Sequence, residues 1–194
     1  MSLISEEFLR GITRQRKVNF SAGLSAPEVL NESFEIHKTY DIFLSHSFLD
    51  KEQIASLKVY LVDLGFSVYV DWIDDRQLVR NRVTKETAER IKQRMKKCKS
   101  MIYAFSKNSN LSKWMPWELG YFDGIKGKIA ILPISSYLNN IDTFKGSEYL
   151  ELYPYVTINK IQGSEKDTLW IRDNINKYVI IDSWIKGYNP IQRN

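Results

Sequence analysis

The chain has 194 residues, of which 43% are hydrophobic and 26% charged, and its formal net charge at pH 7 is +5. This composition is ordinary for a globular protein and excludes extensive disorder, and the modest charge does not require a nucleic-acid partner. One cysteine, Cys98, and two histidines exclude an intrachain disulfide and leave little for a metal site, so we expect no metal. No apolar run reaches the roughly 20 residues that span a bilayer, and no secretory signal is recognisable, so we expect a cytoplasmic protein without membrane attachment.

Residues 1–38 differ in pattern from the rest of the chain, and we expect them to form an N-terminal extension before a domain at residues 39–194. A short helix is predicted from Glu6 to Arg14, followed by irregular chain around Gly23 and Pro27. We expect this extension to be ordered only if it packs on the domain or on a second subunit.

From Tyr40 onward, short apolar runs alternate with amphipathic segments. The runs typical of strands are residues 40–45, 66–70, 101–105, 128–134 and 155–158. A helix that ends at Gly65 follows the first run, and a second helix has Thr84 as its predicted N-cap. A third helix begins around Pro116, which suits a first helical turn, and a C-terminal helix is predicted over residues 167–186.

Strands that are apolar almost throughout and that alternate with helices indicate a parallel sheet covered on both faces. The sequence therefore predicts the α/β class, as a flavodoxin-like three-layer sandwich with a central five-stranded parallel sheet of order 2-1-3-4-5.

In such a sheet the ligand crevice lies beyond the carboxyl ends of the strands, where the strand order reverses. Here that point lies between the first and third strands, and three polar and aromatic segments are predicted to converge on it. The candidate site residues are Ser45, His46, Ser47, Phe48, Asp71, Trp72, Trp114, Trp117 and Glu118.

Glu118 is predicted to lie in the first turn of its helix, where the helix dipole favours an ionised carboxylate. A carboxylate beside two indoles suits a cationic ligand that can stack, such as a nicotinamide riboside. The alternative is that Glu118 only caps its helix and the tryptophans only pack.

The chain resembles the Toll/interleukin-1 receptor (TIR) family over roughly residues 38–160. Four segments carry the resemblance: the strand motif at residues 40–47, the acidic–lysine pair at residues 50–51, the strand and loop entry at residues 68–72, and the Ser-rich stretch at residues 106–118 that ends in Trp-x-x-x-Glu. This resemblance implies the TIR fold for residues 39–194, including the C-terminal helix.

The resemblance also implies an enzyme that cleaves the nicotinamide–ribose bond of NAD. Glu118 would be catalytic, Trp114 and Trp117 would line the pocket, and His46, Ser47 and Phe48 would contact the other side of the ligand. The further residues expected to bind the substrate are Ser45, Asp71 and Trp72. NAD would be a substrate, with no separate cofactor. A stand-alone prokaryotic member implies a role in immune signalling, self-association through TIR–TIR contacts and a downstream effector that senses the product.

Several alternatives stay open at this stage. The product could be linear ADP-ribose or a cyclic isomer, because water and an internal nucleophile would use the same residues. The chain could instead be a non-catalytic TIR adaptor, or an N-glycosidic enzyme like the nucleoside deoxyribosyltransferases. Arg76, Arg80 and Arg82 replace the Pro-Gly pair found in many TIR loops, and they could meet a diphosphate or only be solvated.

Overall fold

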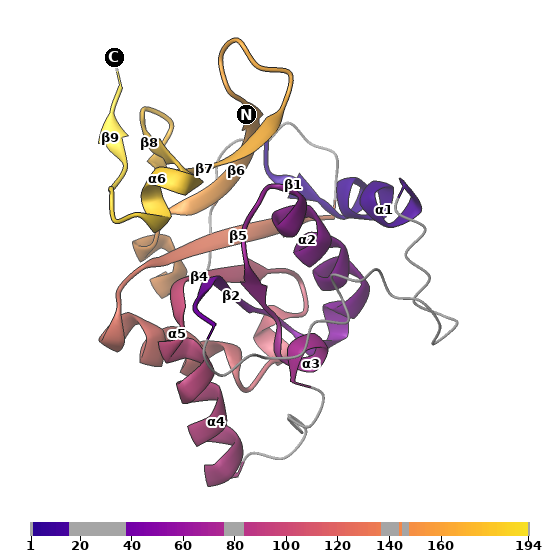
Figure 1. The fold of residues 1–194 in the computed structure, drawn as a ribbon, viewed down its shortest axis with the longest axis vertical. Coiled ribbons are helices and arrows are strands. Elements are labelled where there is room, and N and C mark those ends of the chain that lie inside the picture. Colours follow the sequence, from indigo (N-terminus) through magenta and orange to yellow (C-terminus); the bar gives the residue numbers. More distant parts are fainter. Residues whose placement is uncertain (1, 16–37, 76–83, 137–143, 145–147, 194) are drawn as a thin grey trace.

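A mixed β-sheet with helices on both faces forms the centre of the computed structural model, which describes residues 2–15, 38–75, 84–136, 144 and 148–193 (Figure 1). Five central strands run parallel to one another in the order β3-β2-β4-β5-β6. Their bounds are Val68–Tyr69 for β3, Tyr40–Ser45 for β2, Cys98–Phe105 for β4, Ile129–Ser135 for β5 and Tyr155–Lys160 for β6. The predicted fold class and strand order are confirmed.

Alternating residues of the central strands point to two separate hydrophobic layers. On one face, Ile42 and Leu44 pack in the same cluster as residues of α2 (Lys51–Asp63). On the other face, Phe43 and Met101 pack with residues of α4 (Lys85–Lys96) and α5 (Met115–Ile125). Because both faces are covered, the strands are apolar almost throughout, as expected for a three-layer sandwich.

Short-range signals explain where the helices begin and end. The side chain of Thr84 accepts a hydrogen bond from the Thr87 backbone N–H, so the predicted N-cap of α4 is confirmed. Gly65, at φ +97°, follows α2 in the left-handed conformation that favours glycine. Pro116 lies in the first turn of α5, where its missing N–H costs nothing.

The N-terminal residues belong to the sheet and to one helical layer. β1 (Ile4–Ser5) runs parallel to β5 beside Ile134 and Ser135, and the backbone of Ser2 exchanges hydrogen bonds with that of Ile158 in β6. α1 (Glu6–Gln15) packs on α2 and fully buries Leu9, so the helix predicted here is confirmed. Residues 2–15 thus pack on the domain that was predicted to begin at residue 39.

The predicted C-terminal helix is wrong. Residues 167–186 instead form β7 (Asp167–Asn174), β8 (Lys177–Ile180) and the short helix α6 (Ile181–Ile185), and β9 (Ile191–Gln192) follows at the edge. The side chain of Asn174 accepts a hydrogen bond from the Asn176 backbone N–H in the turn between β7 and β8. β-Branched and aromatic residues suit the antiparallel strands, which extend the sheet from β6.

Shorter elements complete the described chain: η2 (Phe48–Asp50), α3 (Asp71–Asp74), η3 (Ser109–Leu111) and η4 (Glu148–Leu152). The three loop arginines, Arg76, Arg80 and Arg82, lie outside the described residues. Among the helices of the described ranges, none has the length and apolar character needed to cross a bilayer.

Candidate active site

Glu118 lies at the carboxyl edge of the parallel strands, in the first turn of α5, with none of its surface exposed. Its Oε2 accepts a hydrogen bond of 2.6 Å from Oγ of Ser45, the last residue of β2, which is also fully buried. The structure therefore brings together the predicted carboxylate and a residue 73 positions earlier in the chain. Charge-assisted hydrogen bonds of this kind are short and comparatively strong.

His46 and Asp71 form a second buried pair of predicted residues. His46 follows β2 and Asp71 follows β3, and the distance from Nε2 of His46 to Oδ1 of Asp71 is 3.6 Å. The Nδ1 of His46 lies 2.9 Å from the carbonyl oxygen of Leu44, a contact that the protonated nitrogen donates. The imidazole is therefore oriented with Nε2 toward Asp71.

Phe48 and Trp72 both lie within cation–π distance of Lys51. The Nζ of Lys51 lies 3.5 Å from the ring centroid of Phe48 and 6.0 Å from that of Trp72. Phe48 is 52% exposed and Trp72 is half-buried, so both rings lie near the surface at this edge of the sheet. Ser47 caps η2 by accepting a long hydrogen bond from the Leu49 backbone N–H.

The two predicted tryptophans of α5 contact each other. Their ring centroids are 5.4 Å apart in an edge-to-face arrangement, and Trp117 in turn stacks on Tyr121 at 5.9 Å. Trp114 is buried and Trp117 is half-buried. Successive helical positions differ by about 100°, so Trp117 and Glu118 point in different directions from α5.

Asp50 connects the loop after β2 to the loop after β4. Its carboxylate is buried and accepts hydrogen bonds from Oγ of Ser106 at 2.5 Å and from Nδ2 of Asn108 at 2.6 Å. The sequence placed Asp50 in the acidic–lysine pair after the first strand, without assigning it a role in the site. Its role in holding two site loops together depends on a contact between residues more than 50 positions apart.

Tyr103 also lies at this site and was missed from the sequence. It is the register partner of Ser45 in the neighbouring strand β4, and its side chain is buried in the layer that contains α5. Burial, and then electrostatic interactions with Tyr149 and Glu118, raise the pKa of Tyr103, so its hydroxyl stays protonated over the physiological range. A tyrosine in an otherwise apolar strand was the available signal.

The described residues contain no group of three or more His, Cys, Asp and Glu side chains arranged to hold a metal ion. The functional groups described at the site are carboxylates, hydroxyls, an imidazole and aromatic rings.

A parallel sheet of this order, with a carboxylate at the start of the helix after its third strand, is the architecture that the resemblance predicted. Residues 42–165 match the family model described as TIR domain. The chain therefore belongs to the TIR family.

Two bacterial relatives narrow the comparison. The chain is 49% identical over 177 residues to a Bacillus cereus (strain MSX-D12) protein named probable 3' cyclic ADP-D-ribose synthase ThsB', and the match covers 89% of this chain and 90% of that protein. It is 32% identical over 85 residues to a Cytobacillus dafuensis protein named putative cyclic ADP-D-ribose synthase TIR2, which covers 43% of this chain and 22% of that protein.

Proposed function

We propose that the chain is an NAD-consuming enzyme that breaks the nicotinamide–ribose bond and closes the remaining ADP-ribose into a cyclic isomer. The observation that carries this proposal is the 49% identity to a protein named as a probable 3' cyclic ADP-D-ribose synthase, with 90% of that protein covered by the match. The site supplies a buried carboxylate for the same chemistry.

The reaction can proceed with a single carboxylate and does not require a strong general acid. When the bond between the anomeric carbon and the pyridinium nitrogen breaks, nicotinamide leaves as a neutral molecule with the electron pair. Positive charge then develops on the ribose, and Glu118 would stabilise it in a site that excludes water. An internal hydroxyl or ring nitrogen of the ADP-ribose unit then bonds to the anomeric carbon, and any proton that it releases can pass to Glu118.

Substrate binding has to open the site, because Glu118 and Ser45 are both fully buried. We infer that NAD displaces or repositions the side chains around this pair, so that a ribose hydroxyl takes over a hydrogen bond to Glu118. We assign Ser45, His46, Ser47, Phe48, Asp71, Trp72, Trp114 and Trp117 to substrate binding. Among them, Phe48 and Trp72 offer rings near the surface against which a nicotinamide or adenine could stack.

NAD is the only small molecule that this scheme requires, and it acts as a substrate without a separate cofactor. We further propose that the protein self-associates through TIR–TIR contacts and that its cyclic product informs an effector in a prokaryotic anti-phage response. The support for this part is the bacterial origin of the two relatives and the activity for which they are named.

The test is incubation of the purified protein with NAD and chromatographic separation of the products. Glu118→Gln keeps the shape of the side chain and removes its charge, and we expect at least a ~100-fold loss of turnover. Glu89→Gln on the exposed surface of α4 makes the same chemical change away from the site and should keep full activity.

Each other result changes the proposal in a defined way. Turnover that survives in Glu118→Gln would exclude the catalytic role of Glu118. Linear ADP-ribose as the main product would replace cyclisation by hydrolysis. Unchanged NAD with the wild-type protein at high concentration would favour the adaptor alternative.

A further inference from the structure

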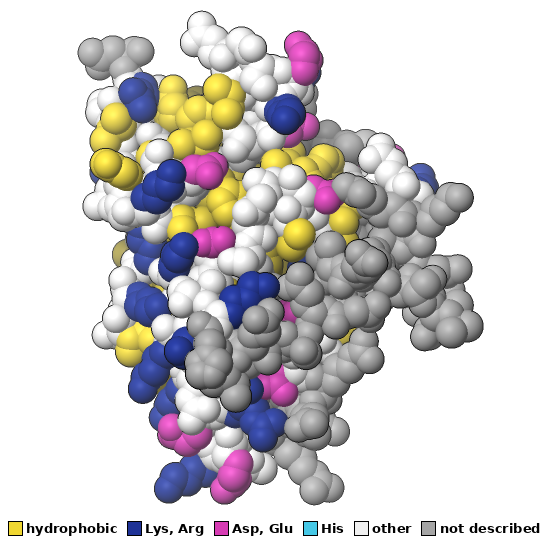
Figure 2. Space-filling model, viewed as in Figure 1, with side chains coloured by type: hydrophobic (Ala, Val, Ile, Leu, Met, Phe, Trp, Pro, Cys, Tyr) yellow, Lys and Arg dark blue, Asp and Glu magenta, His cyan; other side chains and the backbone are white. Residues whose placement is uncertain are grey.

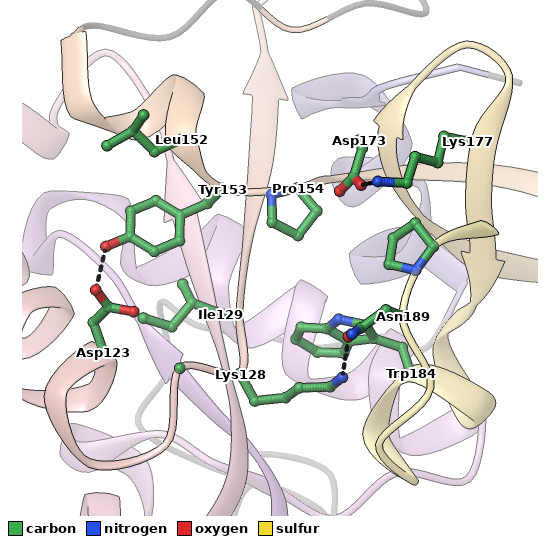
Figure 3. A pocket seen from close by; sticks show the side chains of 12 residues that line it. Asp123, Lys128, Ile129, Leu152, Tyr153, Pro154, Asp173, Lys177, Trp184 and Asn189 are labelled. Atoms are coloured by element: carbon green, nitrogen blue, oxygen red, sulfur yellow. Dashed lines mark hydrogen bonds and ion pairs between the residues drawn. The ribbon is translucent and has the colours of Figure 1, made fainter. Parts of the chain in front are cut away.

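A cavity of about 480 Å³ lies at the amino edge of the parallel sheet, opposite the edge that carries Glu118 (Figure 3). Ile129 at the start of β5 and Pro154 just before β6 form its floor, and the C-terminal unit β7–β8–α6–β9 contributes a second wall. Its volume falls within the roughly 300–1,000 Å³ of typical small-molecule sites. The proposed NAD chemistry uses none of its residues.

The two carboxylates of this cavity already have partners. The hydroxyl of Tyr153 donates a hydrogen bond of 3.1 Å to Oδ2 of Asp123, and Nζ of Lys177 lies 2.7 Å from Oδ2 of Asp173. Figure 3 shows these two pairs on different sides of the cavity. Lys177 neutralises Asp173, whereas Asp123 keeps its charge and only gains a hydrogen bond. Lys128 is the other cation of the lining.

Lys128 has only neutral acceptors. Its Nζ donates to the carbonyl oxygen of Tyr188 and to Oδ1 of Asn189, both at 3.2 Å, and it lies 5.2 Å from the ring centroid of Trp184. Within the described part of the chain it forms no ion pair with a carboxylate. Partial burial lowers the pKa of Lys128, so an anion placed beside its ammonium would restore electrostatic stabilisation that desolvation removes.

Apolar and aromatic side chains form another part of the lining. Ile129, Pro154 and Pro190 line it together with the ring of Tyr153, and Leu152 stands at the rim with 81% of its surface exposed. Figure 2 shows hydrophobic side chains gathered over the C-terminal part of the molecule, with lysine and arginine side chains beside them. A ligand for this cavity would therefore combine an anionic group with a flat or apolar body.

We propose that this cavity binds a small organic phosphate of mononucleotide size, with its phosphate on Lys128 and its planar body against Leu152, Pro154 and Pro190. A phosphate fits better than a carboxylate because its third oxygen can also accept a hydrogen bond from the side-chain amide of Asn189, which lies beside Lys128. This site is separate from the one that contains Glu118 and would bind its ligand without transforming it.

The test uses AMP and adenosine as probes, which share the planar body and differ in the phosphate. Calorimetry should detect AMP binding and much weaker adenosine binding. Lys128→Gln should weaken AMP binding about tenfold or more, because it removes one charge-assisted hydrogen bond. Lys92→Gln, at a half-buried position of α4 away from this cavity, is the matched control and should leave the affinity unchanged.

A second variant guards against a folding defect in Lys128→Gln. Leu152→Glu places a negative charge at the exposed rim, where folding should tolerate it, and it should also weaken AMP binding. Hydrogen-exchange mass spectrometry locates the ligand: AMP should protect residues 127–129, 153–154 and 188–190.

Three results would overturn the proposal: no AMP binding at millimolar concentration, equal binding of AMP and adenosine, or equal AMP affinity in wild type and Lys128→Gln. Protection confined to residues 114–118 would assign AMP to the Glu118 site and would equally overturn it. None of these outcomes depends on NAD turnover, so the proposed function can fail or succeed independently.

Discussion

Removal of the Ser45 hydroxyl should destabilise the protein, and the size of the loss should depend on whether Glu118, its hydrogen-bond acceptor, is ionised. Ser45 Oγ donates to Glu118 Oε2 at 2.6 Å, and neither side chain has exposed surface, so water cannot replace the lost donor. A hydrogen bond to a charged group contributes about 1.5–3 kcal/mol, and a neutral one about 0.5–1.5 kcal/mol. Ser45→Ala should therefore lower the free energy of unfolding by about 1.5–3 kcal/mol at neutral pH, measured by urea denaturation.

Two further variants separate this hydrogen bond from ordinary packing. Ser100→Ala removes another fully buried serine hydroxyl of the same sheet, which donates to the backbone carbonyl of Asp41 at 2.7 Å, and it should cost only about 1 kcal/mol. In a Glu118→Gln background the acceptor is neutral, so Ser45→Ala should cost about 1 kcal/mol less than in wild type. Equal losses for Ser45→Ala in both backgrounds would refute the view that Ser45 stabilises an ionised Glu118.

Three other substitutions test buried interactions that stabilise the fold or connect the loops of the site. Lys58→Met leaves the buried Asp74 carboxylate without its cation, 2.5 Å away, and should lower the free energy of unfolding in urea by about 3–5 kcal/mol; a loss below about 1 kcal/mol would contradict a buried ion pair. Asp50→Ala removes the acceptor of the Ser106 hydroxyl, so hydrogen exchange should accelerate in both loops that flank the site, and unchanged protection would argue against this link. Burial, and then the charge of Asp167, raise the pKa of Tyr60. The contribution of protonated Tyr60 to the free energy of unfolding is therefore complete below the ordinary tyrosine pKa near 10, and it is lost as pH rises through the raised value. Tyr60→Phe should accordingly reduce the fall in unfolding temperature above about pH 10, and identical alkaline profiles for the two proteins would show that Tyr60 does not titrate in unfolding.

The strand order was predictable because it follows from a repeated local pattern. Each parallel strand is a short apolar run, and each helix has an amphipathic period and a local start or stop signal such as Thr84 or Gly65. Once the order was known, general rules for open sheets placed the end of β2 and the start of α5 at the same edge. The hydrogen bond between Ser45 and Glu118 joins these two segments, as that placement predicts.

The C-terminal part was mispredicted because its local signals conflict. Residues 178–181 favour a strand, whereas the surrounding charged and polar residues are compatible with a helix. Pairing with β6 decides the outcome, since it satisfies the backbone of β7 along six residue pairs and buries Leu169 and Ile171 in the core. Those partners lie in a different segment, so no local pattern contains this information.

The N-terminal residues illustrate the same limit. A helix from Glu6 to Arg14 was predicted from the sequence. Its packing on α2 and the position of Ile4 beside Ile134 could be seen only in the folded structure. Likewise, the cavity around Lys128 joins the end of α5, the start of β5 and the C-terminal unit, which are far apart in the sequence.

By itself, then, the sequence determined the class of fold and the order of the parallel strands, and it singled out Glu118 as the candidate carboxylate, because these depend on local periodicity and on motif residues. The tertiary structure alone decided that Ser45 and Tyr103 lie beside that carboxylate, that Asp50 joins two loops of the site, and that the C-terminal residues extend the sheet. Such features depend on contacts between distant segments, where burial and backbone pairing outweigh local preference.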